Sequence, residues 1–520
     1  MYKDHLVIHL FKKQLIFILP LVLVGCGSVG PDFVKPETAV QDEWLEPEEN
    51  KAVNTEEADL TEWWKIFNDP VLDSLITASH KQNLSLQIAG IRILEARAQL
   101  GIAVGDQYPQ TQQLQAGISR VNLSDNEANL TSVQDTSYWD SNAGLNVDWE
   151  LDMWGKFKRG IEAADAELLA SIADYDDVMV SLTGSVATAY IVTRTFEERL
   201  GIARTNVKLQ QRSLDITQVR FRNGATTELD VQQAKTLLFN TKSFIPQFEI
   251  GLRTSKNALS ILLGLPPSDL SELMGEASVI PTAPAEVAIG IPAELLRRRP
   301  DIRRAELQAS AQSARIGLAE SALYPHFSLI GSIGFSSSDT FDSHISDTFQ
   351  SNSIETFAGP SLTWDILNYG RIKNEVRVQD ARLQQLIVNY QNTVLEASRE
   401  VEDAMVSFLR SQEKVVFLQE SETAAQRSVD IALIQYRDGV TDYQRVVDTE
   451  SKLVDAQDKL TETRGTIASN LVAIYRALGG GWTPVRGNDV IPEEMLKEMT
   501  ERTDWGDLLD DPEDTAAAQK

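Results

Sequence analysis

Two stretches of the chain decide how the rest of it is interpreted. Residues 148–158 read DWELDMWGKFK, and residues 363–373 read TWDILNYGRIK. Trp149 aligns with Trp364 and Gly155 with Gly370, so both pairs share a numbering offset of 215. Self-similarity at a constant offset is the signature of a duplicated unit, and it has to be recognised before single elements are assigned.

The same offset recurs far from these stretches. Gly224 aligns with Gly439, and the Leu-Gly step that begins at Leu263 aligns with the one that begins at Leu478. An unchanged offset across several landmarks predicts a structural repeat without large insertions between them.

The N-terminus has the features of a secretory signal peptide over residues 1–25. A basic start precedes ten apolar residues, Leu15–Val24, which are too few to span a bilayer as a helix. The run ends at Cys26, and this context resembles the bacterial lipobox, which predicts a covalent lipid on Cys26. The alternative is a cysteine buried in a hydrophobic helix. Gly27 follows in place of the aspartate that retains lipoproteins at the inner membrane, so the outer membrane is expected.

The charge of the chain excludes some partners. Removing residues 1–25 takes away three lysines and one aspartate, which leaves 45 basic and 75 acidic residues and a net charge of −30. Such a field argues against binding to nucleic acid. No apolar stretch after Cys26 is long enough for a transmembrane helix, so a membrane could be crossed only by strands.

Two very long helices are predicted at equivalent positions. Residues 155–222 contain no proline and show apolar residues at helical spacing, and residues 370–437 form the second copy. A helix of this length spans roughly 100 Å at about 1.5 Å per residue. Each ends in a glycine turn, at 222–226 and 437–441, whose threonine is expected to cap the next helix.

Shorter helices are expected beside the long ones. The returning helices cover about 226–264 and 441–478, and a third helix of each half covers about 82–105 and 301–323. Because the two shorter lengths nearly add up to the longer one, we expect them to stack end to end beside it.

Two strands are predicted in each half, between the third helix and the long helix. Residues 141–152 alternate apolar and polar side chains, as do residues 327–335, and the copy of the former around Trp364 has the same parity. The strand at 111–121 is more polar. The Tyr-Pro steps at Tyr108 and Tyr324 are offset by 216, so one residue is gained or lost there and a bulge is plausible.

This alternation suits a membrane β-barrel with a polar lumen, although a soluble sheet with one buried face shows the same period. Carboxylates on the polar face and aromatics near one end of the strands favour the barrel. The predicted aromatic girdle consists of Tyr108, Trp149, Trp154, Tyr324, Trp364 and Tyr369. Residues 122–140 and 337–355 would form two polar loops of equal length. Four strands cannot close a barrel alone, so two, three or four copies would give eight, twelve or sixteen strands.

An enzyme is the main alternative from another class. After processing, the histidines that remain are His80, His326 and His344, and none stands at metal-ligand spacing with another. No nucleophilic cysteine, phosphate-binding loop or dinucleotide motif is present, so we predict no catalytic residues, no metal site and no cofactor beyond the lipid on Cys26. A passive scaffold of helices is a third possibility, which the alternating strands oppose.

Three motifs carry a family resemblance. VGPDF at residues 29–33, WWKIFNDPVL at 63–72 and PAELLRRRPDIRRAE at 292–306 resemble the TolC-like outer-membrane efflux factors, specifically their NodT/OprM-like lipoprotein branch. The likeness covers nearly all of residues 22–482. It implies a homotrimer with a twelve-stranded barrel in outer-membrane lipid and a periplasmic tunnel of helices. It also implies a periplasmic adaptor protein and an inner-membrane pump of the RND type.

The resemblance also implies functional positions. The two helix turns match the tips that close the tunnel and meet the adaptor; they comprise Arg222, Asn223, Gly224, Ala225, Thr226, Arg437, Gly439, Val440 and Thr441. Tyr436, Asp438, Asp442 and Asp448 are candidates for the periplasmic gate. Arg445 departs from the pattern, because some relatives carry an aspartate there. The alternative role of the turns is ordinary helix capping, and acidic residues near helix ends are often simply solvated.

The predicted architecture is an α+β membrane protein that contributes four strands to a trimeric twelve-stranded barrel, with a long-helix periplasmic barrel and an internal two-fold repeat. The expected segments are a signal peptide (1–25), a lipid-anchored segment with part of the equatorial region (26–81), a first repeat (82–265), an equatorial linker (266–300), a second repeat (301–479) and an acidic tail (480–520). Residues 487–520 of this tail are expected to be mobile or loosely docked. The expected function is an efflux exit duct for small molecules such as drugs or other toxic compounds. The alternatives are the duct of a type I protein secretion system and heavy-metal efflux.

Overall fold

The computed structural model describes residues 27–38, 41, 44–45, 53–54, 60–124, 126, 135–276, 279–284, 287–288, 298–340, 343–483 and 490–509. The predicted signal peptide, Cys26 and residues 510–520 lie outside this set. The chain forms two compact units. Unit 1 takes the described residues within 1–36, 95–170 and 305–389, and unit 2 takes those within 37–94, 171–304 and 390–520.

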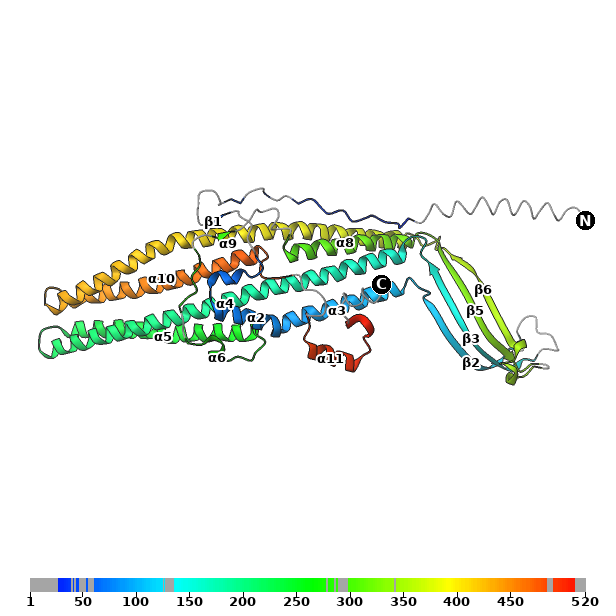
Figure 1. The fold of residues 1–520 in the computed structure, drawn as a ribbon, viewed down its shortest axis with the longest axis horizontal. Helices are drawn as coiled ribbons and strands as arrows, with labels where there is room; N and C mark the ends of the chain where they lie inside the picture. The colour runs from blue at the N-terminus through cyan, green and yellow to red at the C-terminus, as the bar shows by residue number, and fades with distance from the viewer. Residues whose placement is uncertain are drawn as a thin grey trace, which may run out of the picture. The chain divides into compact units, whose positions relative to one another are not determined.

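Unit 1 contains one antiparallel sheet of four strands (Figure 1). The strands are β2 (Thr111–Asn122), β3 (Ser137–Leu151), β5 (His326–Ser338) and β6 (Ile354–Thr363), and they lie in the order β2-β3-β5-β6. The outer edges of β2 and β6 pair with no other strand in the part of the chain that the structure describes. The sheet therefore ends in two open edges, each running the full length of its strand.

The duplication extends to the hydrogen-bond register of the sheet. Thr111 lies opposite Asp148 in the first pair of strands, and His326 lies opposite Thr363 in the second, so both partners keep the numbering offset of 215. The predicted bulge is wrong, because β2 and β3 pair residue for residue without a skip. The extra residue is Gln110, just before β2, whose side-chain oxygen accepts from the Glu150 N–H at 2.7 Å.

One face of the sheet is apolar and uncovered, as the predicted alternation requires. The exposed apolar residues on it are Leu114, Ile118, Leu145, Leu329, Ile333 and Leu362. Uncovered apolar area of this kind marks an interaction surface in a native protein.

Several strand boundaries differ from the prediction. β3 begins at Ser137, earlier than the expected start at Ser141, and β6 ends at Thr363, so Trp364 lies beyond the strand. The connections, at 123–136 and 339–353, are consequently shorter than the predicted loops. The second of these carries the 3₁₀ turns η2 (Ile345–Asp347) and η3 (Ser351–Ser353).

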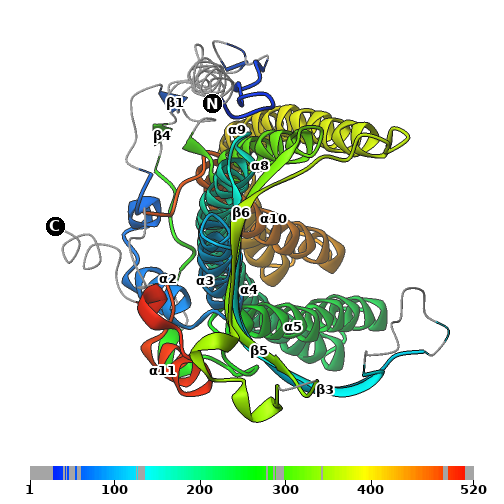
Figure 2. The same cartoon turned by 90° about the vertical axis from the view of Figure 1, so that its right-hand side faces the viewer.

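The helices confirm the repeat closely. The long helices α4 (Lys156–Arg222) and α9 (Arg371–Arg437) have 67 residues each, and the returning helices α5 (Glu228–Leu262) and α10 (Tyr443–Ala477) have 35 each. Figure 2 shows α5 and α10 as neighbouring rods, and α10 also contacts α4 through the Arg199–Asp458 ion pair at 2.8 Å.

The caps of the returning helices lie one residue later than predicted. Thr227, and not Thr226, caps α5 and accepts from the Asp230 N–H in a capping box. Asp442, and not Thr441, caps α10 and accepts from the Arg445 N–H. Threonine and aspartate both serve as N-caps, so the sequence alone left two adjacent positions open.

The shorter helices stack end to end, as predicted. α3 (Leu84–Gly105) and α8 (Pro300–Ser321) have 22 residues each. Just before α3, the Asn83 side chain donates to the Leu262 carbonyl at the end of α5 (2.9 Å). Just before α8, Arg299 donates to the Ala477 carbonyl at the end of α10 (2.7 Å). The same joint is thus built twice, and it satisfies a carbonyl that a helix end leaves without a partner.

The remaining elements of unit 2 are short. They are η1 (Trp63–Phe67), α2 (Pro70–Gln82), α6 (Ser271–Met274), α11 (Glu493–Arg502), η4 (Gly506–Leu509) and a parallel pair formed by β1 (Val53–Asn54) and β4 (Val287–Ala288). Gln82 belongs to α2 and not to the following helix, a small correction. Within the predicted tail, residues 493–502 form the helix α11, in which Met499 is buried. Among the described helices, none is long and apolar enough to cross a bilayer.

Candidate functional site: helix turns and strand–helix junctions

The two predicted tips are built by the same hydrogen bonds. In each turn a glycine with positive φ, +71° at Gly224 and +77° at Gly439, ends the long helix. The N–H groups of Ala225 and Val440 each donate to a carbonyl five residues earlier, both at 2.8 Å. This is the Schellman arrangement, which requires a left-handed residue and therefore favours glycine. The tip residues are exposed, except for Thr226 and Thr441, which are partly buried.

Arg220 joins the two turns within unit 2. Its guanidinium donates to the carbonyls of Tyr436 (2.6 Å) and Arg437 (3.2 Å) and lies 4.5 Å from the centre of the Tyr436 ring. Figure 1 shows both turns at the same end of the helices. The repeat equivalent of Arg220 is Gln435, so no sequence pattern pointed to this link.

Tyr436, a predicted gate residue, is only 4% exposed. Its ring meets Tyr443 edge-on at 5.1 Å, in a core cluster that also includes Leu214 and Val446. In one copy of the chain, Tyr436 therefore holds the turns together instead of facing solvent.

The three aspartates of the predicted gate are exposed, in contrast to Tyr436. Asp442 caps α10, Asp448 accepts from Gln444 at 2.7 Å, and Asp438 lies 3.4 Å from the Arg437 guanidinium. They point to no common partner within the described part of the chain, so the structure does not assemble them into one site.

A buried carboxyl that the sequence did not indicate lies near these turns. Glu450 on α10 is 1% exposed, and its Oε1 accepts from the Ser213 hydroxyl of α4 at 2.6 Å. Its Oε2 has no hydrogen-bond partner among the described residues. Burial raises the pKa of Glu450, and the bond from Ser213 opposes that shift only in part.

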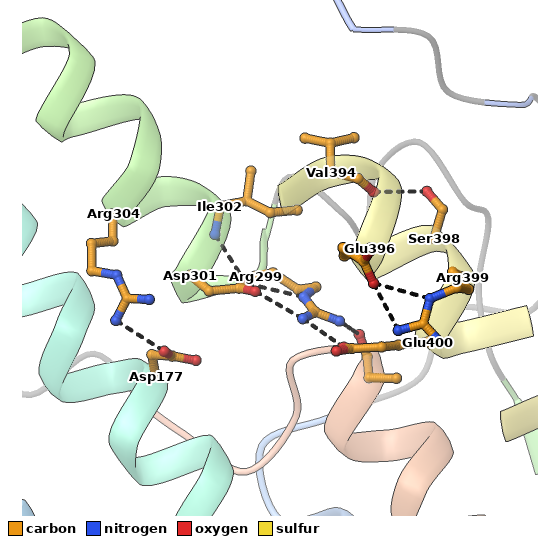
Figure 3. Close-up of polar contacts among 11 residues, drawn as sticks. Asp177, Arg299, Asp301, Ile302, Arg304, Val394, Glu396, Ser398, Arg399 and Glu400 are labelled. Atoms are coloured by element: carbon orange, nitrogen blue, oxygen red, sulfur yellow. Dashed lines mark hydrogen bonds and ion pairs between the residues drawn. The ribbon is translucent and has the colours of Figure 1, made fainter. Parts of the chain in front are cut away.

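Arg299, from the PAELLRRRPDIRRAE motif, is a second link that the sequence did not assign. Figure 3 shows its guanidinium between Asp301 and Glu400. It forms a two-pronged ion pair with Asp301 (3.0 and 2.8 Å), bonds Glu400 at 2.9 Å, and donates to the Ala477 carbonyl. Arg299 therefore fastens the beginning of α8 to both α9 and α10 in unit 2.

The strand–helix junctions of unit 1 repeat one hydrogen bond. The Trp149 indole donates to the Gln107 carbonyl at 3.2 Å, and the Trp364 indole donates to the Leu323 carbonyl at 3.0 Å. The numbering offset is 215 between the two tryptophans and 216 between the two carbonyl residues. The difference arises because the first half has one extra residue, Gln110, between its carbonyl residue and its tryptophan. Each indole thus ties the end of a strand to the preceding helix.

The other aromatics of the predicted girdle divide into two groups. Trp154 stacks on Tyr324 with ring centres 4.7 Å apart, and its indole donates to the Pro325 carbonyl at 2.8 Å. Tyr108 is 64% exposed and Tyr369 is 99% exposed. Four of the six girdle aromatics therefore have partners within a single chain, whereas Tyr108 and Tyr369 stay exposed.

The chain that follows Cys26 is fixed against the same junction. The buried Arg159 donates to the carbonyls of Val29 (3.2 Å) and Gly30 (3.3 Å) and pairs with Asp32 at 2.7 Å. Gly30 has φ +88°, and a Cβ there would come within 2.3 Å of the Gly317 backbone. Only glycine permits this approach.

The ring of each described histidine bonds a side chain of another residue. His80 meets Thr183 at 2.8 Å, His326 meets Glu150 at 2.8 Å, and His344 meets Asp339 at 3.0 Å. Within the described ranges, no group of three or more His, Cys, Asp or Glu side chains is placed to hold a metal ion.

Comparison with known proteins places this fold. A family model described as outer membrane efflux protein matches residues 75–265 and 291–480. Nodulation protein T of Rhizobium leguminosarum bv. viciae is 29% identical, over 89% of this chain and 92% of that protein. The pyoverdine export outer membrane protein OpmQ of Pseudomonas putida is 30% identical, over 89% of this chain and 96% of that protein.

Solved structures agree with the sequence relatives. The outer-membrane channel OprN is 31% identical with a TM-score of 0.80, over 87% of this chain and 99% of that one. A structure of CusC is 26% identical with a TM-score of 0.76, over 88% of this chain and 100% of that one. The repeat, the long helices and the sheet are thus those of a known family: the chain belongs to the outer membrane efflux proteins and is an efflux channel of the outer membrane.

Proposed function

We propose that three copies of this chain close into one duct through which a tripartite pump expels small molecules across the outer membrane. The four-stranded sheets would form a twelve-stranded barrel, and the long helices would form the periplasmic tunnel. The observation that carries the proposal is the pair of open edges on β2 and β6.

Open edges of this length need partners. An unpaired edge exposes a row of N–H and carbonyl groups, which soluble proteins normally blunt or cover. In a bilayer these groups would have no water to bond, so only a closed barrel satisfies them. Leu114 on β2 and Leu362 on β6 are both exposed in the single chain, which fits an apolar wall facing lipid.

The helices supply an independent argument, because the two halves differ in burial at equivalent positions. Four apolar residues of α4 are buried, and their equivalents on α9 are exposed; the buried set is Ala163, Ala173, Val180 and Ile191, and the exposed set is Val378, Val388, Leu395 and Val406. Helices of the second half flank α4, as the Asp177–Arg304 pair to α8 (3.1 Å) illustrates. The equivalent neighbours of α9 would be α3 and α5 of an adjacent copy.

The number of copies follows from the width of the lumen. Two copies would give eight strands, and an eight-stranded barrel is filled by its own side chains or holds only one small ligand. Three copies leave room for an aqueous bore.

The helix turns would form the periplasmic mouth. Around a three-fold axis, each exposed aspartate near the second turn would appear three times, and such a carboxylate ring repels itself and attracts cations. Asp438, Asp442 and Asp448 are the candidates for the ring. Tyr436 is assigned a different role, which is to brace the turns from behind through Arg220 and Tyr443.

The partners of the duct would be a periplasmic adaptor at the exposed tips and an inner-membrane pump of the RND type that delivers cargo. A lipid on Cys26 would add a tether in the membrane. The structure is compatible with this, because Arg159 fixes the following residues beside the strand–helix junction.

Family membership leaves the cargo open. One relative is named for pyoverdine export and another, from Escherichia coli, for cation efflux. We favour small toxic compounds, and a polypeptide or a heavy metal would each be revealed by the substrate tests below.

The test compares cells that lack the chain with cells that carry it on a plasmid. We expect the deletion to raise the intracellular level of a fluorescent efflux dye several-fold and the plasmid to restore export. Purified protein should sediment as three chains in detergent and open ion-conducting channels in planar bilayers. A monomer that gives no conductance would refute the proposal. A normal dye level with a lost secreted polypeptide, or with sensitivity confined to metal salts, would shift the cargo assignment.

A further inference from the structure

The Trp154–Tyr324 stack of unit 1 has an exposed counterpart in the other half of the repeat. Trp154 is equivalent to Tyr369 at the offset of 215, and Tyr324 is equivalent to Tyr108 at the offset of 216 that applies before Gln110. The backbone supports the second equivalence, because the N–H of each tyrosine donates to the carbonyl three residues earlier at 3.1 Å. One aromatic pair is therefore joined inside the chain, while its equivalent is separated.

The separated pair lies at the two ends of the sheet. Tyr108 precedes the edge strand β2, and Tyr369 follows the edge strand β6. Tyr369 has a φ of +50°, a conformation that non-glycine residues seldom adopt, and its ring touches almost nothing. Trp154 is not among the residues with positive φ. The junction around Tyr369 thus lacks the aromatic stacking partner that Trp154 has in Tyr324.

The register of the sheet gives the same result in finer detail. The pair β2 with β3 superimposes on the pair β5 with β6 at the single offset of 215. The central pair, β3 with β5, has no equivalent within one chain. Its equivalent would be β6 with the β2 of another copy, and its register can be transferred residue by residue.

We propose that an adjacent copy completes the repeat at this edge, with Tyr369 stacked on Tyr108 of the adjacent copy and β6 antiparallel to that copy's β2. Because Asp148 lies opposite Ile330, Thr363 lies opposite Gln115 of the adjacent copy. This inference rests on the proposed ring of copies and specifies its contact.

The proposal also accounts for the early end of β6. β3 continues to Leu151 because β5 pairs with it there, at Trp149 opposite Leu329. The equivalent of Trp149 is Trp364, which lies just beyond β6. In the ring, Trp364 lies opposite Leu114 of the adjacent copy, and β6 continues through Ile366.

A register-specific cross-link tests the strand pairing. The chain has a single cysteine, Cys26, so the variant Gln115→Cys with Thr363→Cys introduces the only other thiols. Residues directly opposite in antiparallel strands lie about 4.5–5.5 Å apart between Cα atoms, within the range of a disulfide. After mild oxidation of intact outer membranes, we expect bands of two and three chains on a non-reducing denaturing gel.

The matched control keeps Gln115→Cys and moves its partner two positions along the strand, to Ser361→Cys. At about 3.4 Å per residue, its distance from position 115 rises to roughly 8 Å, beyond disulfide range. We expect a single-chain band. A ladder in the control with none in the first variant would overturn the register.

The tyrosine stack is tested by the heat stability of the oligomer in dodecyl sulfate. Tyr369→Ala should lower the temperature at which the oligomer dissociates, whereas Tyr369→Phe, which keeps the ring, should not. Tyr108→Ala should lower it by a similar amount and add little to Tyr369→Ala, because both changes break one contact. Additive losses would assign the two rings to separate contacts with lipid and would overturn the stack.

These outcomes separate the contact from the duct. Three chains in detergent with normal conductance, but no cross-link between positions 115 and 363, would refute the inferred contact and leave the proposed function standing. Absence of any closed oligomer would refute the proposed function itself.

Discussion

Replacing Arg299 with methionine should destabilise unit 2 more than any comparable change on the surface of the helices. Arg299 is 8% exposed, and its guanidinium bonds Asp301 and Glu400 (Figure 3) and also the Ala477 carbonyl. Methionine keeps most of the apolar stem and removes every one of these bonds. The change therefore isolates the polar function of the side chain.

The expected loss can be estimated from the partners. Removing one member of a buried ion pair costs about 3–5 kcal/mol, because the remaining charge loses its compensation. Most of this cost comes from Asp301, because its side chain is largely buried and would lose its ion-pair partner. Glu400 is half exposed, so its pair with Arg299 contributes little to the stability. At roughly 2 °C per kcal/mol, Arg299→Met should lower the Tm by about 6–10 °C.

Arg399→Met is the matched control. Arg399 pairs with Glu396 at 2.7 Å and Asp403 at 2.9 Å, but all three side chains are exposed and lie on the same helix. Such exposed pairs are screened by water and contribute little to stability, so the Tm should stay close to that of the unchanged protein. Arg299→Lys keeps the positive charge but loses the planar guanidinium, so its Tm should lie between those of Arg299→Met and Arg399→Met.

The assay is thermal unfolding of the detergent-purified protein, followed by circular dichroism at the helix band. Proteolysis around residues 298–303 should accelerate in Arg299→Met alone, because that variant releases the beginning of α8. Equal Tm values for Arg299→Met and Arg399→Met would refute the reasoning, since exposure would then not decide the value of the pair.

Three further predictions concern buried acids and the turns. Burial raises the pKa of the Asp176 carboxyl to about 7, although the charge of Arg303 opposes the shift. The folded state therefore holds the carboxyl proton more tightly than the unfolded state does. The stability that this group contributes is complete below about pH 4 and is lost as the pH rises towards 7. Asp176→Asn should therefore leave the Tm at pH 4 nearly unchanged and raise it at pH 8, where the free energy of unfolding should increase by up to on the order of 4 kcal/mol. A smaller gain at pH 8 than at pH 4 would contradict the sign. Burial also raises the pKa of Glu450, so Glu450→Gln should flatten the decline in Tm above pH 5, and a decline that persists unchanged would exclude this carboxyl as its source. Gly224→Ala and Gly439→Ala should each cost about 1 kcal/mol of stability, because alanine is strained at positive φ. Gly101→Ala should instead stabilise the protein, because Gly101 lies in a helix and a Cβ added there meets no atom within 4 Å. Equal effects would show that the turns do not need their left-handed residue.

Much of the fold could be predicted because the strands of the four-stranded sheet and the helices α3, α4 and α5 each have an equivalent in the other half of the chain. Helical spacing and the absence of proline placed α4 and α9 almost to the residue, and Gly224 and Gly439 fixed their ends. The alternation around Trp149 identified β3, although not its earlier start at Ser137.

The parts that were missed depend on neighbours that a periodic pattern does not identify. Whether Thr226 or Thr227 caps α5 is decided by the geometry of one turn, and whether β6 continues past Thr363 is decided by the strand beside it. The family resemblance made Tyr436 a gate candidate, but its ring packs against Arg220 and Tyr443, and the repeat equivalent of Arg220 is glutamine. The sequence did not predict the contribution of Arg299 either. At the offset of 216 that applies before Gln110, its equivalent is Asn83, so the repeat shows no arginine at both positions.

The two edges of the sheet have a consequence for how the copies are counted. The edges of β2 and β6 are different, so a contact between β6 of one copy and β2 of the next is a head-to-tail interface. Such an interface can be repeated for any number of copies. The hydrogen bonds at the edges do not set the number of copies in the ring. That number is set by the angle through which each copy is rotated relative to the previous one. That angle is distributed over the twist of the strands and the crossing of the long helices. Substitutions far from either edge could therefore alter the stoichiometry, yielding wider rings or open spirals, while every contact between neighbours stays intact.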